Sequence, residues 1–209
     1  MWVLGLISIL AGIALLLVLF YRLWFLRNPK RPIPQGKAIV SPADGTIARI
    51  VPFSQSKLSL TIEKGLLGRI RASTGDVAKA GYLIVIVMTP LDAHYQKAPC
   101  DCRVMGTRHT EGKFLNAVIG AKDLRAAFEN EHNTILLDTE HGRMKVIQIA
   151  GFLARRIHCF VRPGQRLKKG EDLGIIKLGS QVCLIIPKLK LKIREGQHVL
   201  GGNTVIAEP

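Results

Sequence analysis

Three short segments of this chain carry residues whose types suit nucleophilic chemistry. Ser180 follows Gly179, and a glycine permits the unusual backbone angles of a tight turn and leaves its carbonyl open to attack. His94 comes after an apolar run and the turn Thr89-Pro90, where a neutral imidazole could accept the serine proton near physiological pH. Asp44 stands in Pro-Ala-Asp-Gly, and its carboxylate could orient the histidine. Such a set would let the serine cleave the peptide bond that precedes it.

Each of these segments also has a purely structural interpretation. Gly179-Ser180 by itself is most often an ordinary turn between strands, and the Asp44 sequence by itself is a β-turn. His94 could be a hydrogen-bonded structural histidine. Asp92 and Asp101 are alternative carboxylates, and spacing alone does not decide between Asp44 and Asp92.

The remaining histidines and the cysteines predict no metal site. No two histidines have the spacing of a helical HExxH motif. Cys100 and Cys102 are separated by one residue, whereas the usual zinc knuckle has two residues between its cysteines. We expect four reduced thiols, which are typical of a protein that faces the cytosol.

The N-terminal residues, as far as Tyr21, contain no charged side chain and predict a membrane-spanning helix. A helix of this length spans about 31 Å, the thickness of a bilayer's hydrocarbon core. A cleaved signal peptide would need a positive region before the apolar run and small residues at the cut site, and neither is present. Basic residues follow the segment, which places the next domain on the cytoplasmic side of a cell membrane. We expect a retained anchor helix over residues 1–26.

A basic, proline-rich linker is expected over residues 27–36, and the folded domain over residues 37–209. The β-favouring runs of this domain are short and mostly bounded by turn residues: Thr46–Pro52, Leu58–Ile62, Tyr82–Met88, Thr134–Leu137, Met144–Ile149 and Val182–Ile186. Helical patterning is weak, and Asn116–Phe128 is the best short candidate. Glycine-spaced turns at residues 162–170 and 194–202 are typical of stacked hairpins. We expect a mainly β domain with small helices, similar to the compact barrel-sandwich hybrid of biotinyl and lipoyl carriers.

The charge of the chain favours an anionic partner. Thirty Lys and Arg against fifteen Asp and Glu give a net charge of +15. Only 6% of residues are aromatic, and no repeat of aromatic and basic residues predicts a surface on which bases could stack. The partners that we expect are therefore an anionic phospholipid and the membrane, and not nucleic acid.

Seven short motifs, taken in order, resemble those of the phosphatidylserine decarboxylase family in its short form, which includes archaetidylserine decarboxylases. They are Arg27–Arg31, Ser41–Gly45, Thr89–His94, Ala98-Pro99, Glu111–Phe114, Glu129–Glu131 and Leu178–Ser180. Each is weakly specific by itself. Seven in the right order, over about residues 22 to 187, are a strong indication of the family.

The resemblance implies a proenzyme that cleaves itself at Gly179-Ser180, with Asp44, His94 and Ser180 as its catalytic residues. An N→O acyl shift and β-elimination would turn Ser180 into a pyruvoyl cofactor. The products would be a β chain of residues 1–179 and an α chain of residues 180–209, which form a heterodimer whose further oligomerisation stays open. The pyruvoyl ketone would form a Schiff base with the lipid's serine headgroup, and loss of CO₂ would leave ethanolamine. Phosphatidylserine and archaetidylserine share this headgroup, so both remain open as substrates.

A few positions depart from the family pattern, although none of the three catalytic residues is lost. Gln181 stands where serine or threonine is common, and Lys97 stands where some relatives have a second histidine. The group that donates the proton in the decarboxylation step therefore stays open, and His94 could serve in both steps.

A non-enzymatic alternative is a membrane-anchored adaptor or carrier domain of the barrel-sandwich type. The anchor and the glycine-spaced hairpins would suit it. However, such adaptors usually carry a long coiled coil, and carriers have a modified lysine at a hairpin tip. The chain shows neither a heptad run nor a lysine in that context.

Overall fold

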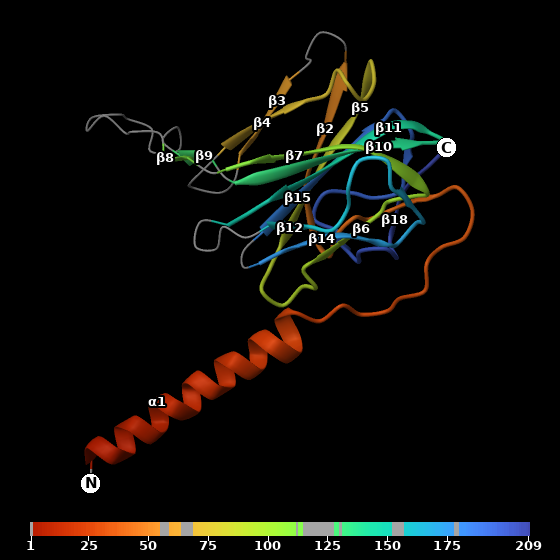
Figure 1. Cartoon of the computed structure of the whole chain (residues 1–209). Coiled ribbons are helices and arrows are strands. Elements are labelled where there is room, and N and C mark those ends of the chain that lie inside the picture. Colours follow the sequence, from red (N-terminus) through yellow and green to blue (C-terminus); the bar gives the residue numbers. More distant parts are fainter. Residues whose placement is uncertain are drawn as a thin grey trace.

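The computed structural model describes residues 2–54, 59–63, 69–111, 113–114, 128–129, 131–151, 157–177 and 180–209. Within these residues, one apolar helix stands below a β domain that consists of a large sheet and three smaller ones (Figure 1). The expectation of a mainly β domain behind an N-terminal helix is confirmed.

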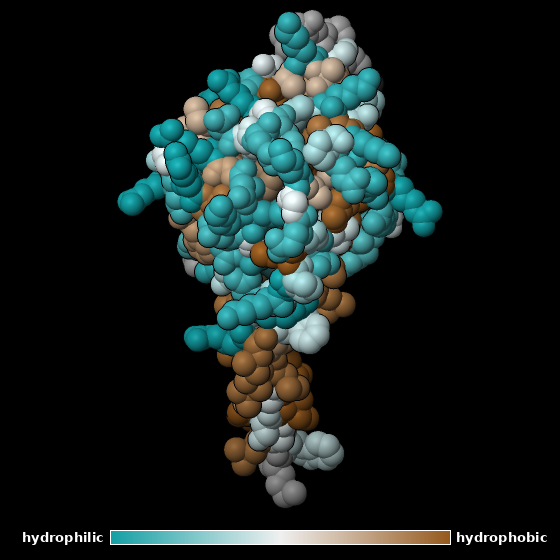
Figure 2. All heavy atoms as spheres, turned by 90° about the vertical axis from the view of Figure 1, so that its right-hand side faces the viewer, coloured by the Kyte–Doolittle hydropathy of each residue, from teal (hydrophilic) through white to brown (hydrophobic). Residues whose placement is uncertain are grey.

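The helix α1 (Trp2–Leu19) continues as a π-helical segment, η1 (Phe20–Phe25). Of the described residues, this is the one helix long and apolar enough to cross a membrane. No residue of α1 is buried, and the helix forms a mostly brown stalk below a mostly teal domain in Figure 2. A helix that is apolar on all sides suits lipid rather than water. Phe25 differs from the rest, because its side chain is buried.

The large sheet is antiparallel throughout and has the strand order β13-β7-β10-β11-β15-β5-β2-β17. In chain order its strands are β2 (Gly45–Ser54), β5 (Ala80–Met88), β7 (Cys102–Thr110), β10 (His132–Thr139), β11 (Gly142–Ile149), β13 (Arg166–Leu167), β15 (Ser180–Pro187) and β17 (His198–Val199).

Three smaller sheets complete the described part of the domain. Their members are β1 (Ile39–Val40), β18 (Val205–Glu208) and β16 (Lys190–Leu191); β12 (Ile157–Cys159), β14 (Asp172–Ile176) and β6 (Tyr95–Lys97); and β3 (Ser59–Glu63), β4 (Arg69–Ser73), β9 (Phe128–Glu129) and β8 (Lys113–Phe114).

The β-favouring runs predicted from the sequence all fall in strands, five in the large sheet and one in β3. Leu58, the first residue of that sixth run, lies outside the described residues. The predicted helix Asn116–Phe128 is not tested, because residues 116–127 also lie outside them; Phe128 itself is in β9.

The core explains why β15 reads as a continuous apolar run rather than as an alternating one. Val182, Leu184 and Ile186 belong to the larger hydrophobic cluster, which includes residues of β14 and β18. Cys183 and Ile185 belong to a second cluster, which includes Ala72 of β4. Successive side chains of a strand point to opposite faces of the sheet, so β15 is buried on both faces.

The sheet brings the three chemical motifs of the sequence to one end of neighbouring strands. The last residue of β5, Met88, pairs with Ser180, the first residue of β15. On the other side of β5, the start of β2 pairs with its end, with Thr46 opposite Val87. Adjacent strands lie about 4.8 Å apart. The segment before β2, the loop after β5 and the start of β15 therefore meet at the same end of these three neighbouring strands.

Candidate active site

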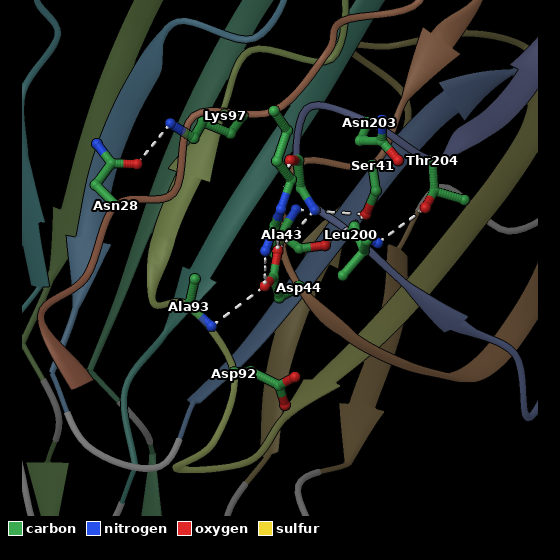
Figure 3. Close-up of polar contacts among 12 residues, drawn as sticks. Asn28, Ser41, Ala43, Asp44, Asp92, Ala93, Lys97, Leu200, Asn203 and Thr204 are labelled. Carbon is green, nitrogen blue, oxygen red and sulfur yellow. Dashed lines mark hydrogen bonds and ion pairs between the residues drawn. The ribbon is translucent and has the colours of Figure 1, made fainter. Parts of the chain in front are cut away.

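The carboxylate of Asp44 is buried and accepts four hydrogen bonds. The guanidinium of Arg31 donates to both oxygens, from Nη1 to Oδ1 and from Nη2 to Oδ2 at 2.7 Å. The backbone N–H of Gly201 donates to Oδ1 at 2.8 Å, and that of Ala93 donates to Oδ2 at 3.2 Å (Figure 3). A two-pronged arginine–carboxylate pair is strong and directional. Asp44 therefore fastens together the segment after the helix, the loop after β5 and the turn that precedes β18.

A glycine sets the direction in which the chain leaves Asp44. Gly45 has φ +138°, in the region that favours glycine, and a Cβ at this position would collide with the backbone carbonyl oxygen of Val87. Before the aspartate, the Ser41 hydroxyl donates to the Ala43 carbonyl oxygen at 2.6 Å. The Ser41–Gly45 motif is thus a tight turn that presents one carboxylate at the start of β2.

His94 is fully buried, and only one of its ring nitrogens has a described partner. Nδ1 lies 2.8 Å from the backbone carbonyl oxygen of Asp92. Because a carbonyl oxygen can only accept, Nδ1 carries the proton in the neutral ring and Nε2 is the basic nitrogen. Among the described residues, Nε2 has no hydrogen-bond partner. A buried imidazole with a free basic nitrogen is suited to act as a general base.

The surroundings of His94 favour the neutral imidazole. Burial lowers the pKa of His94 below its ordinary value of 6.5, and the nearby charge of Arg27 lowers it further. The carbonyl and carboxylate of Asp92 and the carboxylate of Asp44 act in the opposite direction, but burial prevails.

The side chain of Asp92 serves the loop rather than the imidazole. Its Oδ2 accepts hydrogen bonds from the backbone N–H and the hydroxyl of Thr89, at 2.7 and 2.8 Å. Its Oδ1 lies 3.0 Å from Nε2 of His198. Burial acts to raise the pKa of Asp92, but these hydrogen bonds outweigh it and lower the pKa. In Figure 3 the Asp92 carboxylate points away from Asp44.

The carboxylates of Asp44 and Asp92, between which the sequence did not decide, have different hydrogen-bond partners in the structure. Within the described contacts, the oxygens of Asp44 do not bond to the imidazole of His94; they reach its loop through the N–H of Ala93. The imidazole is oriented instead by the main-chain carbonyl of Asp92. Asp101, the third candidate, is exposed and accepts from the backbone N–H of Lys169.

The predicted nucleophile is only partly described. Gly179 lies outside the described residues, and the structure gives only the backbone position of Ser180, opposite Met88. The catalytic roles of Asp44, His94 and Ser180 therefore stay predictions. What the structure adds is that Asp44 and His94 belong to one hydrogen-bonded network, at the end of the sheet where β15 begins.

Sequence reasoning missed a chain of buried amides behind His94. The Gln96 side chain donates to the His94 carbonyl oxygen at 2.7 Å and accepts from Gln148 at 2.7 Å, and Gln148 accepts from Asn133 at 2.8 Å. These residues come from three different strands, and no local pattern marks them as partners. Lys97, at the position of a second histidine in some relatives, is paired with Asp172 at 2.6 Å.

In the described part of the chain no metal centre stands out, and the thiols of Cys100 and Cys102 are poorly reactive. No group of three or more His, Cys, Asp or Glu residues there is placed to hold a metal ion. Burial raises the pKa of Cys100 to about 11 and that of Cys102 to about 12, so both stay protonated near neutral pH.

Comparison with known proteins places these features in a family. The family model for phosphatidylserine decarboxylase matches residues 19–207. The chain is similar to the phosphatidylserine decarboxylase proenzyme of Chlorobaculum tepidum, with 36% identity over 96% of this chain and 83% of the relative. It is 36% identical to the proenzyme of the same name from Carboxydothermus hydrogenoformans, over 97% of this chain and 86% of the relative. It is also 32% identical to a protein of Methanocaldococcus jannaschii named "Putative archaetidylserine decarboxylase proenzyme", over 94% of this chain and 93% of the relative.

Proposed function

The chain belongs to the phosphatidylserine decarboxylase family of carboxy-lyases, and from this premise we propose that it converts its own Ser180 into a pyruvoyl cofactor and decarboxylates a serine-headgroup phospholipid. The observation that carries the proposal is the imidazole of His94. It is buried, its Nδ1 is fixed by a carbonyl, and its Nε2 has no partner among the described residues; the loop that carries it follows β5, whose last residue, Met88, pairs with Ser180 at the start of β15.

In the self-processing reaction, His94 would act as the base. Its Nε2 takes the hydroxyl proton of Ser180, and Oγ attacks the carbonyl carbon of Gly179. As the ester bond forms, the peptide C–N bond breaks and the freed nitrogen receives a proton. Loss of the Cα proton of residue 180 then expels the Gly179 carboxylate and leaves dehydroalanine. Water finally replaces the nitrogen, which departs as ammonia.

The residues around the strand end fit a pyruvoyl group at position 180. The loop after β5, whose last residue pairs with Ser180, carries a buried imidazole whose Nε2 has no partner among the described residues, so a proton can be held or delivered there without breaking another bond. When formed, the pyruvoyl ketone supplies an electron-accepting carbonyl for the amino group of the substrate. Because Lys97 is engaged with Asp172, His94 would serve as the proton-carrying group in both steps.

The apolar helix supports a site that works at the membrane. It would anchor the chain in a cell membrane with the β domain in the cytoplasm, since the basic residues lie on the domain side. Basic residues close to anionic headgroups contribute about 1 kcal/mol each to membrane attraction. The cleaved α and β chains would stay together, because β15 lies between β11 and β5 in the sheet.

The proposal is tested on the full-length protein by intact-mass analysis and a lipid assay. We expect two chains, residues 1–179 and residues 180–209, whose masses together equal that of the uncleaved chain plus water minus ammonia. Cleaved protein should release CO₂ from vesicles that contain phosphatidylserine or archaetidylserine, assayed separately. A chain that stays intact refutes self-processing, and a cleaved protein inactive on both lipids refutes the substrate class.

The pH dependence of self-processing should reflect the buried histidine. A general base must be neutral, so the rate rises with pH through the pKa of His94 and then levels off. Because burial lowers this pKa below 6.5, we expect the rate to be past its half-maximum before pH 6.5 is reached. The measurement is the cleavage half-time of freshly synthesised chain across the acidic and neutral range. A half-maximal rate above pH 6.5 would contradict the assignment of His94 as this base.

A further inference from the structure

The segment that leaves the membrane helix, Phe25–Arg31, contacts both loops that carry the candidate site. We call it the juxtamembrane segment. The ring of Phe25 packs against the ring of His94, and the guanidinium of Arg27 donates to the backbone carbonyl oxygen of Leu91. In Figure 1 the upper end of the helix meets the yellow-green loop between β5 and β6, which contains these two partners. What the sequence presents as a linker is therefore docked on the site.

Phe25 covers the imidazole of His94. The two ring centroids are 3.9 Å apart, with 32° between the ring planes. Both side chains are 0% exposed, whereas the neighbouring Leu23 is 73% exposed. At Phe25 the apolar helix thus buries one side chain in the β domain, and this side chain packs against His94, the proposed base.

Arg31, at the other end of the juxtamembrane segment, binds the second candidate site residue, Asp44. Its guanidinium bonds to both carboxylate oxygens, and the same carboxylate accepts from the N–H of Ala93, next to His94 in the chain. Between the two anchoring residues, Asn28 accepts from Lys97 at 2.8 Å (Figure 3) and donates to Asp172, also at 2.8 Å. The segment is therefore fastened at its start, middle and end.

We propose that Phe25 and Arg31 are positioning residues of the active site, Phe25 seating the imidazole of His94 and Arg31 fixing the carboxylate of Asp44. The end of the membrane helix is then one wall of the site, so the serine headgroup reacts where the chain leaves the bilayer. The assignment rests on the proposed function and deepens it. The family motif Arg27–Arg31 acquires a physical role, which is to connect the anchor to the chemistry.

The first test measures how well His94 is covered, without any need for cleavage. The full-length Ser180→Ala chain in lipid nanodiscs is treated with diethyl pyrocarbonate, which acylates accessible neutral imidazoles, and labelling of His94 is followed by peptide mass. We expect Phe25→Ala to raise the labelling rate roughly tenfold or more by opening the site locally. Leu23→Ala also removes a large apolar side chain from the same end of the helix, but this side chain is exposed, so the labelling rate of His94 should stay unchanged.

The pH dependence of this labelling reports the environment of the ring. Removing Phe25 admits water, so the pKa of His94 should rise towards 6.5, with Asp92, Asp44 and Arg27 still facing it. Phe25→Leu keeps an apolar side chain but loses the aromatic ring, and it provides an intermediate variant if Phe25→Ala unfolds. Unchanged labelling and an unchanged pH midpoint in both Phe25 variants would overturn the positioning role of Phe25.

The second test measures self-processing in the Arg31 variants of the otherwise natural chain. Arg31→Gln should slow cleavage roughly a hundredfold, because it leaves a buried carboxylate without its partner. Arg31→Lys keeps the charge but not the fork and should recover part of the rate. Arg49→Gln makes the same chemical change at an exposed arginine of β2 and should cleave normally. Normal cleavage by Arg31→Gln would overturn its role.

The two readouts separate this inference from the proposed function. If His94 becomes accessible in Phe25→Ala but the natural chain never cleaves, the positioning stands and self-processing fails. If the natural chain cleaves while the Phe25 and Arg31 variants behave like their controls, self-processing stands and the positioning fails.

Discussion

Replacing Ser180 with alanine should leave the protein as a single chain of 209 residues with no decarboxylase activity. Alanine lacks the Oγ that attacks the Gly179 carbonyl, so neither the ester nor the pyruvoyl group can form. The effect is therefore a complete loss rather than a reduction, because the same atom is needed first for cleavage and then, through its elimination, for the cofactor. Denaturing electrophoresis and intact mass would show the uncleaved chain.

The control for this variant is Ser180→Cys, which keeps a nucleophile of similar size at the start of β15. We expect slow but detectable cleavage, since a thiol can undergo the same acyl shift. Both variants should unfold at the same urea concentration as freshly made, uncleaved natural chain. Two chains of natural length from Ser180→Ala would move the cleavage site elsewhere in the sequence.

Asp44→Asn should reduce the rate of self-processing on the order of a thousandfold or more, since it disrupts a buried ion pair and the loop that carries the base. An amide can accept with only one of its two ends. The amide NH₂ of the new asparagine would face groups that are themselves donors, namely the guanidinium of Arg31 or the N–H groups of Gly201 and Ala93, and could not bond to them. The Arg31 side chain is 19% exposed and that of Asp44 is 4% exposed, and breaking a largely buried ion pair of this kind costs about 3–5 kcal/mol. The measurements are the cleavage half-time and, in Ser180→Ala chains, urea unfolding.

Asp92→Asn is the matched comparison, and it settles the choice between the two carboxylates that spacing left open. Its side chain serves Thr89 and the half-exposed His198, whereas the imidazole is held by its main-chain carbonyl, which the substitution keeps. We expect roughly tenfold slower processing or less. If Asp92→Asn stops cleavage while Asp44→Asn does not, the orienting role belongs to Asp92.

The network around Asp44 bears on the alternative function of an adaptor or carrier domain. Such a domain needs no buried base with a free nitrogen, yet here His94 is fully buried with Nε2 unpartnered among the described residues. Leaving a buried polar atom unpaired is costly and calls for an explanation, and the role of a general base supplies one for Nε2 of His94. Together with the family relationship, this favours the enzyme.

Local patterns in the sequence were sufficient to predict the N-terminal helix and six of the described strands, whereas β7 and the shorter strands were not predicted. The apolar N-terminal run and the short β-favouring runs depend on side chains close together in the chain, and they appear as α1, η1 and the predicted strands. The residues of the candidate site were also marked locally, by turn sequences around Asp44 and His94 and by the glycine before Ser180. Their order along the chain was enough to identify the family.

Pairing between distant residues was decided only by the tertiary structure. The bond between Gly201 and Asp44 joins residues 157 positions apart, and the ring contact of Phe25 with His94 joins the helix end to a loop after the fifth strand. Spacing suggested a carboxylate on the imidazole, but the folded chain places a main-chain carbonyl there and gives the carboxylate to Arg31. A sequence shows which groups are available within a turn or a strand, whereas burial and the path of the chain determine which groups meet.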